Sequence, residues 1–362
     1  MPQLRVRIGC VVLAVIMSAV TYYFVEPRLR WGRYGGFKAV GLLSVMVIIG
    51  VTGYSIDRHD GYTARMNDPD QPVIDAINQH LADDNKRCLS VISDWHSDEN
   101  NCLMQKAPGE NTIALIGDSH SRHLYFGLVA KAQDNEGVAV FPASCAAPLM
   151  GLHSGADPTA LSIFPDRAKT EHLLSEAFSY ILNHKNINKV VLVHNPGCSW
   201  NNVIDTLNPD NHDFGSILHD GFVRTYDALT KAGKDIYVIF DNPSYTNEFW
   251  GKCRSVAVRR PSRIFDVLPL NNNNACTLSS SERVDRKEVD NWEKIARETS
   301  AGYKNIHFID LEQFFCPRDV CSMLGLNGEF LYMDFNHLNK KGSIYVAPFI
   351  LDHLRHSREV KE

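Results

Sequence analysis

Two short segments, far apart in the sequence, carry residue types that could perform nucleophilic catalysis. The first is the tetrapeptide GDSH at 117–120, where an apolar run at 112–118 meets a helical pattern that begins at Ser121. A serine in such a turn can present its hydroxyl as a nucleophile, while its own backbone N–H lies at the positive end of the helix dipole and can stabilise an oxyanion. Serine and aspartate are also common helix N-caps, so capping by Ser119 or Asp118 explains the tetrapeptide equally well.

The second segment is the tetrapeptide DFNH at 334–337, directly before the last helical pattern. Aspartate and histidine three residues apart in a turn can face each other. Asp334 then accepts the imidazole N–H of His337, fixes its tautomer and leaves the other nitrogen as a base. The alternative is an acidic residue near a helix start beside a surface histidine. A metal pair would need a third ligand, and no further carboxylate or histidine is suitably spaced nearby, so we expect neither a metal nor a cofactor.

These side chains can meet only if the fold brings the two segments together, and the sequence pattern predicts such a fold. Five short, continuous apolar runs alternate with longer helical patterns, which is typical of a parallel sheet covered by helices on both faces. We therefore predict a three-layer α/β/α sandwich around a five-stranded, mostly parallel sheet. The predicted strands are 112–118, 137–141, 189–194, 234–241 and 305–310, and the predicted helices are 121–133, 167–186, 215–232, 282–301 and 339–356. The longest irregular stretches follow strand ends, where an open parallel sheet places its site.

The front of the chain is basic, whereas the rest is acidic. Residues 1–66 hold 8 lysines and arginines against 3 acidic residues, and the remaining 296 residues hold 29 against 39. An acidic main part argues against a general nucleic-acid binder, which needs a cationic face to neutralise phosphates.

Two uncharged runs of 18 residues, 8–25 and 39–56, are each long enough to cross a bilayer as a helix. A cleaved signal peptide could explain the first run, but no small-x-small cleavage site is evident at its end, so we predict a transmembrane hairpin. The connector carries four basic residues against two in the N-terminal tail, which predicts a cytoplasmic connector and sends both chain ends across the membrane. We therefore divide the chain into the hairpin at 1–56, a periplasmic linker and extension at 57–111, and the α/β domain at 112–362.

Eight of the nine cysteines lie in the acidic part, without the paired C-x-x-C spacing of a zinc site. An even set of this kind favours disulfides, and therefore an oxidising compartment outside the inner membrane. Eight buried free thiols in a cytoplasmic enzyme are the alternative. Sequence alone cannot fix the connectivity, but close pairs are the natural expectation: Cys316 with Cys321, Cys253 with Cys276, Cys88 with Cys102, and then Cys145 with Cys198.

The two tetrapeptides and the front of the chain resemble known families. GDSH at the first strand-to-helix turn and DxxH before the last helix resemble blocks one and five of the SGNH hydrolase superfamily. The stretch TYYFVEPRLR at 21–30 resembles the end of the last core span in the membrane acyltransferase-3 family. Proteins that combine both parts are similar to bacterial O-acetyltransferases that modify lipopolysaccharide O-antigen or other envelope glycans. The resemblance implies Ser119 as nucleophile, His337 as base and Asp334 as its partner.

The resemblance also implies a setting and an oxyanion hole. The usual ten-helix acyltransferase core is absent, so the chain resembles the C-terminal portion of such a protein. It would be a multi-pass protein of the bacterial inner membrane with its SGNH domain in the periplasm, and its partners would be the bilayer, the missing membrane-embedded core, an acetyl donor and an envelope glycan acceptor. The family's block-two glycine and block-three asparagine are not obvious. Asn195, directly after the strand at 189–194, is placed for an oxyanion donor beside the Ser119 N–H, and Gly151 is a poorer match; Asn-Pro-Gly at 195–197 is alternatively a simple turn.

These features favour O-acyl transfer, and first of all O-acetyl transfer, to a cell-envelope glycan through an acyl-serine intermediate. A carbohydrate esterase would use the same three residues with water as the acceptor. A non-catalytic glycan-binding partner of a separate membrane acyltransferase is the alternative from a different class.

Overall fold

The structure is a computed structural model, and its described residues form two compact units, Met1–Pro69 and Asp70–Glu362. The described residues are 4–27, 35–58, 70–92, 102–106, 111–154, 167–199, 203–257, 273–284 and 286–356.

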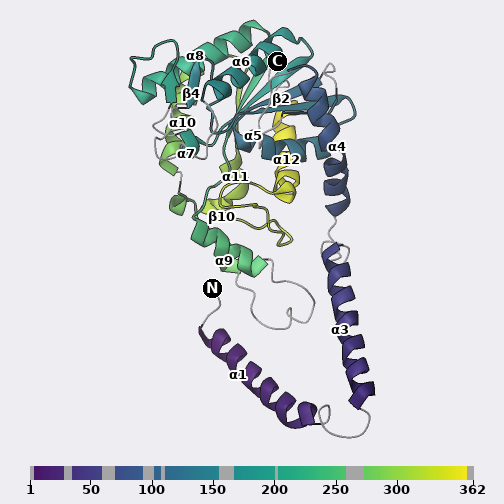
Figure 1. The fold of residues 1–362 in the computed structure, drawn as a ribbon. Coiled ribbons are helices and arrows are strands. Elements are labelled where there is room, and N and C mark those ends of the chain that lie inside the picture. The colour runs from purple at the N-terminus through teal and green to yellow at the C-terminus, as the bar shows by residue number, and fades with distance from the viewer. Residues whose placement is uncertain are drawn as a thin grey trace. The chain divides into compact units, whose positions relative to one another are not determined.

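The first unit consists of two apolar helices (Figure 1): α1 (Leu4–Val20), which continues into a π-helical turn (Thr21–Val25), and α3 (Gly35–Arg58). Among the described residues, one helix, Gly36–Arg58, is long and apolar enough to cross a membrane, whereas the apolar part of the first helix spans Val11–Phe24. This indicates one membrane anchor. The second crossing of the expected hairpin is not shown and stays a prediction, and most of the basic connector lies outside the described residues.

A six-stranded sheet forms the centre of the second unit. Its order is β1 (Leu103–Met104), β3 (Glu136–Pro142), β2 (Asn111–Gly117), β5 (Ile187–Val193), β7 (Asp235–Phe240) and β9 (Ile306–Asp310). The last five of these are parallel and coincide with the five predicted strands, which are therefore confirmed. β1 adds an antiparallel edge strand beside β3. Its two residues are too few to produce an alternating pattern, so this strand could not be predicted.

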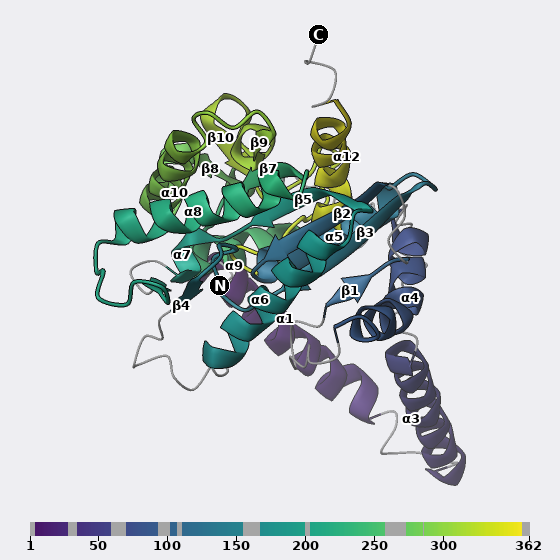
Figure 2. The same cartoon turned by 90° about the horizontal axis from the view of Figure 1, so that it is seen from above.

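Alternate residues of each central strand face two separate cores, because successive side chains of a strand point to opposite faces of the sheet. On β2, Ala114 and Ile116 pack into the first core, and Ile113 and Leu115 into the second. The first core is covered by α6 (Arg167–Asn183), α8 (Phe214–Lys231) and α10 (Arg286–Thr299), and the second by α5 (Ser119–Lys131), α11 (Leu311–Phe315) and α12 (Lys340–His356) (Figures 1 and 2). The predicted three-layer α/β/α sandwich is confirmed.

Smaller elements surround this sandwich. Two short antiparallel pairs, β4 with β6 and β8 with β10, lie outside the main sheet. The remaining elements are α4 (Gln71–Leu89), β4 (Leu152–Ser154), α7 (Pro196–Ser199), β6 (Val203–Asp205), α9 (Asn247–Ala257), β8 (Thr277–Ser279), β10 (Val320–Ser322) and the 3-10 turns Asn273–Cys276, Ser280–Glu282 and Pro317–Asp319.

Four disulfides connect the loops and small elements, and they match the expected pairing. The bond between Cys145 and Cys198 joins the loop after β3 to α7 after β5, so it ties together two segments that follow the strand ends. Together with the apolar helix Gly36–Arg58, the disulfides indicate a membrane-anchored or extracytoplasmic domain. They contradict the alternative of eight free thiols. The four pairs are Cys88–Cys102, Cys145–Cys198, Cys253–Cys276 and Cys316–Cys321.

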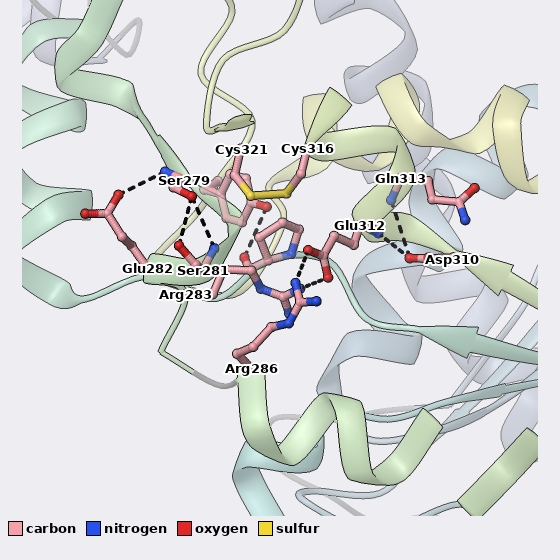
Figure 3. Close-up of a disulfide and its surroundings, with 12 residues drawn as sticks. Ser279, Ser281, Glu282, Arg283, Arg286, Asp310, Glu312, Gln313, Cys316 and Cys321 are labelled. Carbon is pink, nitrogen blue, oxygen red and sulfur yellow. Dashed lines mark hydrogen bonds and ion pairs between the residues drawn. A yellow bond between two sulfur atoms is a disulfide. The ribbon is translucent and has the colours of Figure 1, made fainter. Parts of the chain in front are cut away.

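An ion cluster lies beside one of these disulfides and holds the region that leads to the second tetrapeptide. Figure 3 shows the carboxylate of Glu312 between the guanidinium groups of Arg283 and Arg286, next to the Cys316–Cys321 bond. Arg283 is buried, and a buried charge is tolerated when it is paired in this way. The cluster therefore connects α10 to α11, and the disulfide connects α11 to β10.

Helices α5 and α12 approach each other closely at Gly127. Its backbone N–H donates to the Ser343 hydroxyl at 2.7 Å, and that hydroxyl donates to the Leu124 carbonyl at 3.2 Å. A Cβ atom at position 127 would lie 1.9 Å from the Ser343 carbonyl oxygen, so only glycine permits this approach. Because α5 begins with Ser119 and α12 follows His337, the contact helps to fix the distance between the two tetrapeptides.

Gly127→Ala should destabilise the domain, because its added methyl group must push the two backbones apart. We expect the free energy of unfolding to fall by about 1–3 kcal/mol, as for other overpacked cores. Gly251→Ala is the matched control: this glycine is exposed in α9 with nothing within 4 Å of its Cβ position. The control should gain roughly 0.5–1 kcal/mol from higher helix propensity. Denaturant unfolding of the full chain in detergent measures both, and equal effects would contradict the steric argument.

Candidate active site

Ser119 is the first residue of α5, and Asp118 is the N-cap of that helix. The Asp118 carboxylate accepts the backbone N–H of His120 at 2.9 Å. The serine hydroxyl instead lies 2.7 Å from Nε2 of His337. Capping is therefore the role of Asp118. The hydroxyl of the partly buried Ser119 contacts a histidine, which is the arrangement that a serine nucleophile requires.

A glycine precedes this turn because β2 runs very close to β5. A Cβ atom at Gly117 would lie 1.8 Å from the Val193 carbonyl oxygen. The absence of a side chain lets the ends of the two strands lie side by side. The residues that follow the strands, Asp118 and Asn195, therefore meet.

The second tetrapeptide forms a turn around the Asp334 carboxylate. Oδ2 lies 2.8 Å from Nδ1 of His337, and Oδ1 accepts the backbone N–H groups of Asn336 and His337 at 2.9 and 2.7 Å. Burial raises the pKa of Asp334, but these hydrogen bonds outweigh it and lower the pKa to about 2. The carboxylate is therefore ionised at neutral pH. It holds the proton on Nδ1 and leaves Nε2 to accept the proton of the Ser119 hydroxyl.

The loop after β7 supports the turn at 334–337 through hydrogen bonds. The side-chain amide of Asn242 donates to the Asn336 carbonyl at 2.8 Å, and the backbone N–H of Tyr245 donates to the Phe335 carbonyl at 2.9 Å. The hydroxyl of the buried Tyr332 donates to the Pro243 carbonyl at 3.2 Å. The position of His337 therefore depends in part on the loop after β7, where Asn242 lies 94 positions earlier in the chain than Asn336.

Asp118 also connects the turn that carries Ser119 to the end of β5. Its Oδ2 lies 2.9 Å from Nδ1 of His194 and accepts the backbone N–H of Asn195 at 2.7 Å. Burial raises the pKa of Asp118, and the hydrogen bond and charge of His194 more than offset it, so the net pKa is lowered. An ionised, buried carboxylate with three donors holds the turn rigidly. Neither the type nor the spacing of Asp118 and His194 in the sequence indicates this contact.

The two expected oxyanion donors besides the Ser119 N–H occupy different surroundings. Asn195 forms the expected turn, with Oδ1 accepting the Gly197 N–H at 3.0 Å, and its Nδ2 faces Nε2 of His120 at 3.1 Å. Gly151 has a φ of +75° and its carbonyl accepts from Thr206. Among the described residues, Gly151 makes no hydrogen bond to Ser119. Both oxyanion roles stay predictions.

Three buried groups beside the serine could be considered as metal ligands: His120, His123 and Asp241 place ligand-type atoms within 4.8 Å of one another. His120 and His123, however, already use ring nitrogens in hydrogen bonds to other protein groups. Nδ1 of His120 pairs with Asp241 at 2.9 Å, and Nδ1 of His123 accepts the backbone N–H of Leu338 at 3.3 Å, which keeps the proton on Nε2. Burial and the neighbouring imidazoles lower the pKa of His123, so it is neutral. A cation would have to break the first bond and change the tautomer of His123, so the group fits a hydrogen-bonded network better than a metal centre.

Comparison with known proteins places this arrangement in a family. The sequence profile described as "SGNH domain (fused to AT3 domains)" matches residues 84–352, a range that contains the main sheet and both tetrapeptides. No curated protein matches the chain. Similar solved structures include the acetyl xylan esterase AlAXEase, with 13% identity, a TM-score of 0.36, and coverage of 67% of this chain and 98% of that one. They also include the salicylyl-acyltransferase SsfX3 from a tetracycline biosynthetic pathway, with 13% identity, a TM-score of 0.34, and coverage of 69% of this chain and 55% of that one.

Proposed function

Because this chain belongs to the family of SGNH domains that are fused to AT3 domains, we propose that it transfers an O-acyl group, first of all acetyl, to a cell-envelope glycan such as lipopolysaccharide O-antigen. The observation that carries the proposal is the hydrogen-bonded series from the Ser119 hydroxyl through His337 to Asp334, with links of 2.7 and 2.8 Å. Nucleophile, base and orienting carboxylate in this order suit acyl transfer through a covalent intermediate.

The reaction is a double displacement. Nε2 of His337 takes the proton of the Ser119 hydroxyl while Oγ attacks the carbonyl carbon of the acetyl donor. The tetrahedral intermediate collapses, the bond to the donor's leaving group breaks, and His337 returns the proton to that group. A sugar hydroxyl then attacks the acetyl-serine, with His337 again as base, and the ester forms on the glycan as Ser119 recovers its proton.

The negative oxygen of each tetrahedral intermediate needs preorganised donors. The backbone N–H of Ser119 at the start of α5 is one, and the side-chain amide of Asn195 is the second. The support for Asn195 is its position: its backbone N–H is bonded to Asp118, directly before the nucleophile. Gly151 remains the weaker candidate for a third donor.

Hydrolysis is the competing outcome, and one observation favours it as the second candidate. The side chains of His337 and Asp334 are 23% and 35% exposed, so water can reach the base. A carbohydrate esterase would then complete the cycle with water in place of the sugar. A non-catalytic glycan-binding role is less well supported, because binding alone does not require the Ser119–His337 hydrogen bond.

The cellular setting is part of the proposal. The acidic domain would lie in the periplasm, anchored to the bacterial inner membrane by one or both N-terminal helices. The acetyl group would arrive from a membrane-embedded acyltransferase core. The apolar helix Gly36–Arg58 and the four disulfides support this location.

The acceptor can be identified by incubating the full chain in detergent with 4-nitrophenyl acetate as donor and purified O-antigen polysaccharide as acceptor. We expect acetyl esters on the polysaccharide that are absent with Ser119→Ala. Ser300→Ala, a half-buried serine directly after α10, is the matched control and should match the wild type. Ser119-dependent acetate release without glycan acetylation would replace the transferase with the esterase. Background rates in all three proteins would favour the binding role.

A further inference from the structure

The ring of His120 lies between two polar side chains from different strand ends. Its Nδ1 is 2.9 Å from a carboxylate oxygen of Asp241, directly after β7, and its Nε2 is 3.1 Å from the amide nitrogen of Asn195, after β5. His120 is 1% exposed, and Asp241 and Asn195 are 2% and 4% exposed. A hydrogen-bonded series of carboxylate, imidazole and carboxamide is therefore buried beside the nucleophile.

The direction of these hydrogen bonds follows from Asn195. Its Oδ1 accepts the backbone N–H of Gly197, so the atom that faces His120 is the NH₂ group, which can only donate. Nε2 of His120 must then accept, and the ring is the neutral tautomer whose Nδ1–H donates to Asp241. His120 thus donates to a carboxylate through Nδ1 and accepts through Nε2, as His337 does between Asp334 and Ser119. The donor to Nε2 is the Asn195 amide here and the serine hydroxyl there.

Protonation of the ring would disturb this arrangement. Burial lowers the pKa of His120, but the Asp241 carboxylate raises it more, to about 9, and this pKa by itself favours the protonated ring at neutral pH. A second proton on Nε2, however, would point at the NH₂ group of Asn195 with no acceptor between them. Turning the amide over would bring its NH₂ against the Gly197 N–H. The hydrogen bonds therefore favour the neutral ring while Asn195 is present.

We propose that His120, held by Asp241, is a positioning residue that fixes the Asn195 carboxamide as an oxyanion donor. The amide nitrogen has two N–H groups, and His120 takes one of them, which orients the other. The ring centroid of His120 is 4.6 Å from that of His337, so the Asn195 amide and the Ser119 hydroxyl contact two neighbouring imidazole rings. His120 itself is too buried to touch a substrate. The inference rests on the proposed acyl-serine chemistry.

A double-mutant cycle tests this coupling, with the full chain in detergent and 4-nitrophenyl acetate as substrate. Asn195→Ala should lower kcat by about 10²–10³-fold, as the loss of one oxyanion donor does in other enzymes, with little change in KM. His120→Phe keeps a ring but has no acceptor, and should lower kcat by about 10²-fold on the same basis. Because His120 acts through Asn195, the double variant should be no slower than Asn195→Ala alone.

A rescue variant separates positioning from packing. Gln at position 120 offers an amide oxygen that can accept from Asn195, so His120→Gln should retain at least about tenfold more kcat than His120→Phe. Should His120→Phe fail to fold, Asp241→Asn replaces it: its amide can donate to Nδ1, move the proton to Nε2 and remove the acceptor, with a comparable loss. Thermal unfolding midpoints report on folding.

The outcomes distinguish this inference from the proposed function. Losses that multiply in the double variant, or a Gln variant no faster than the Phe variant, would overturn the role of His120 while Ser119 still proves essential. Turnover that persists in Ser119→Ala would instead overturn the acyl-serine chemistry itself, and the positioning role with it.

Discussion

Ser119→Ala should lower kcat/KM for 4-nitrophenyl acetate by about 10⁴–10⁶-fold, the range seen when a serine nucleophile of this kind is removed. The expected loss is large because no other hydroxyl among the described residues contacts His337, so no side chain can take over the attack. The change should leave KM for the ester nearly unaltered, since the missing atom acts in the bond-forming step. The measurement is the initial rate at which free acetate is released from the ester by each protein.

Stability provides the control for this variant. Alanine removes one partly exposed hydroxyl and keeps the helix start, which Asp118 caps, so the unfolding midpoint should change little. Ser300→Ala should behave as the wild type in both measurements. Wild-type rates in Ser119→Ala with the fold intact would mean that another group performs the reaction.

Asp334→Asn should lower kcat by about 10⁴-fold, as the equivalent change does in a serine protease triad. The amide oxygen can still accept the backbone N–H groups of Asn336 and His337, so the turn keeps its shape. The amide nitrogen, however, would face Nδ1 and donate to it. The imidazole proton then moves to Nε2, which can no longer accept from Ser119.

The pH dependence of this variant is part of the test. In the wild type, the pKa of Asp334 is about 2, so the carboxylate stays ionised from neutral pH down to strongly acidic conditions, and its titration cannot cause a loss of activity above about pH 3. For stability the sign is the same: the contribution of the depressed pKa is present above the usual aspartate value and is lost as the pH falls towards 2. Asp352→Asn, an exposed aspartate on α12, is the control and should retain the wild-type profile. An Asp334→Asn enzyme within tenfold or so of the wild type at every pH would contradict the orienting role.

The sheet could be predicted from the sequence because its central strands are fully buried. Each of them is a continuous apolar run bounded by polar turns, as in β5 and β7, where nearly every residue is buried. The meeting of the two tetrapeptides is expected from their resemblance to two blocks of one family and not from the sheet, because the second one lies well beyond β9, which ends at Asp310, and so follows no strand of the main sheet. The edge strand β1 could not be predicted, since its pairing depends on β3 and not on a local pattern.

The supporting residues of the site could not be predicted for a related reason. Asp241 reaches His120, and His194 reaches Asp118, only because β2, β5 and β7 are neighbours in the sheet. The strand order follows from long-range packing, which hydrophobic periodicity does not encode. An aspartate or histidine after an apolar run is also an ordinary feature of loops, so neither type nor spacing marked these residues.

The most direct test of the account is to trap the covalent intermediate. The full chain is mixed with 4-nitrophenyl acetate without a glycan acceptor, quenched in acid within the first turnover, and analysed by intact mass and peptide mapping. We expect one added acetyl group on the peptide that contains Ser119. This adduct should be absent from Ser119→Ala, and it should accumulate in a variant that releases the acetyl group from the serine slowly. An acetyl group on another residue of the wild type, or Ser119-dependent turnover with no acetylated enzyme at any time, would contradict the acyl-serine mechanism.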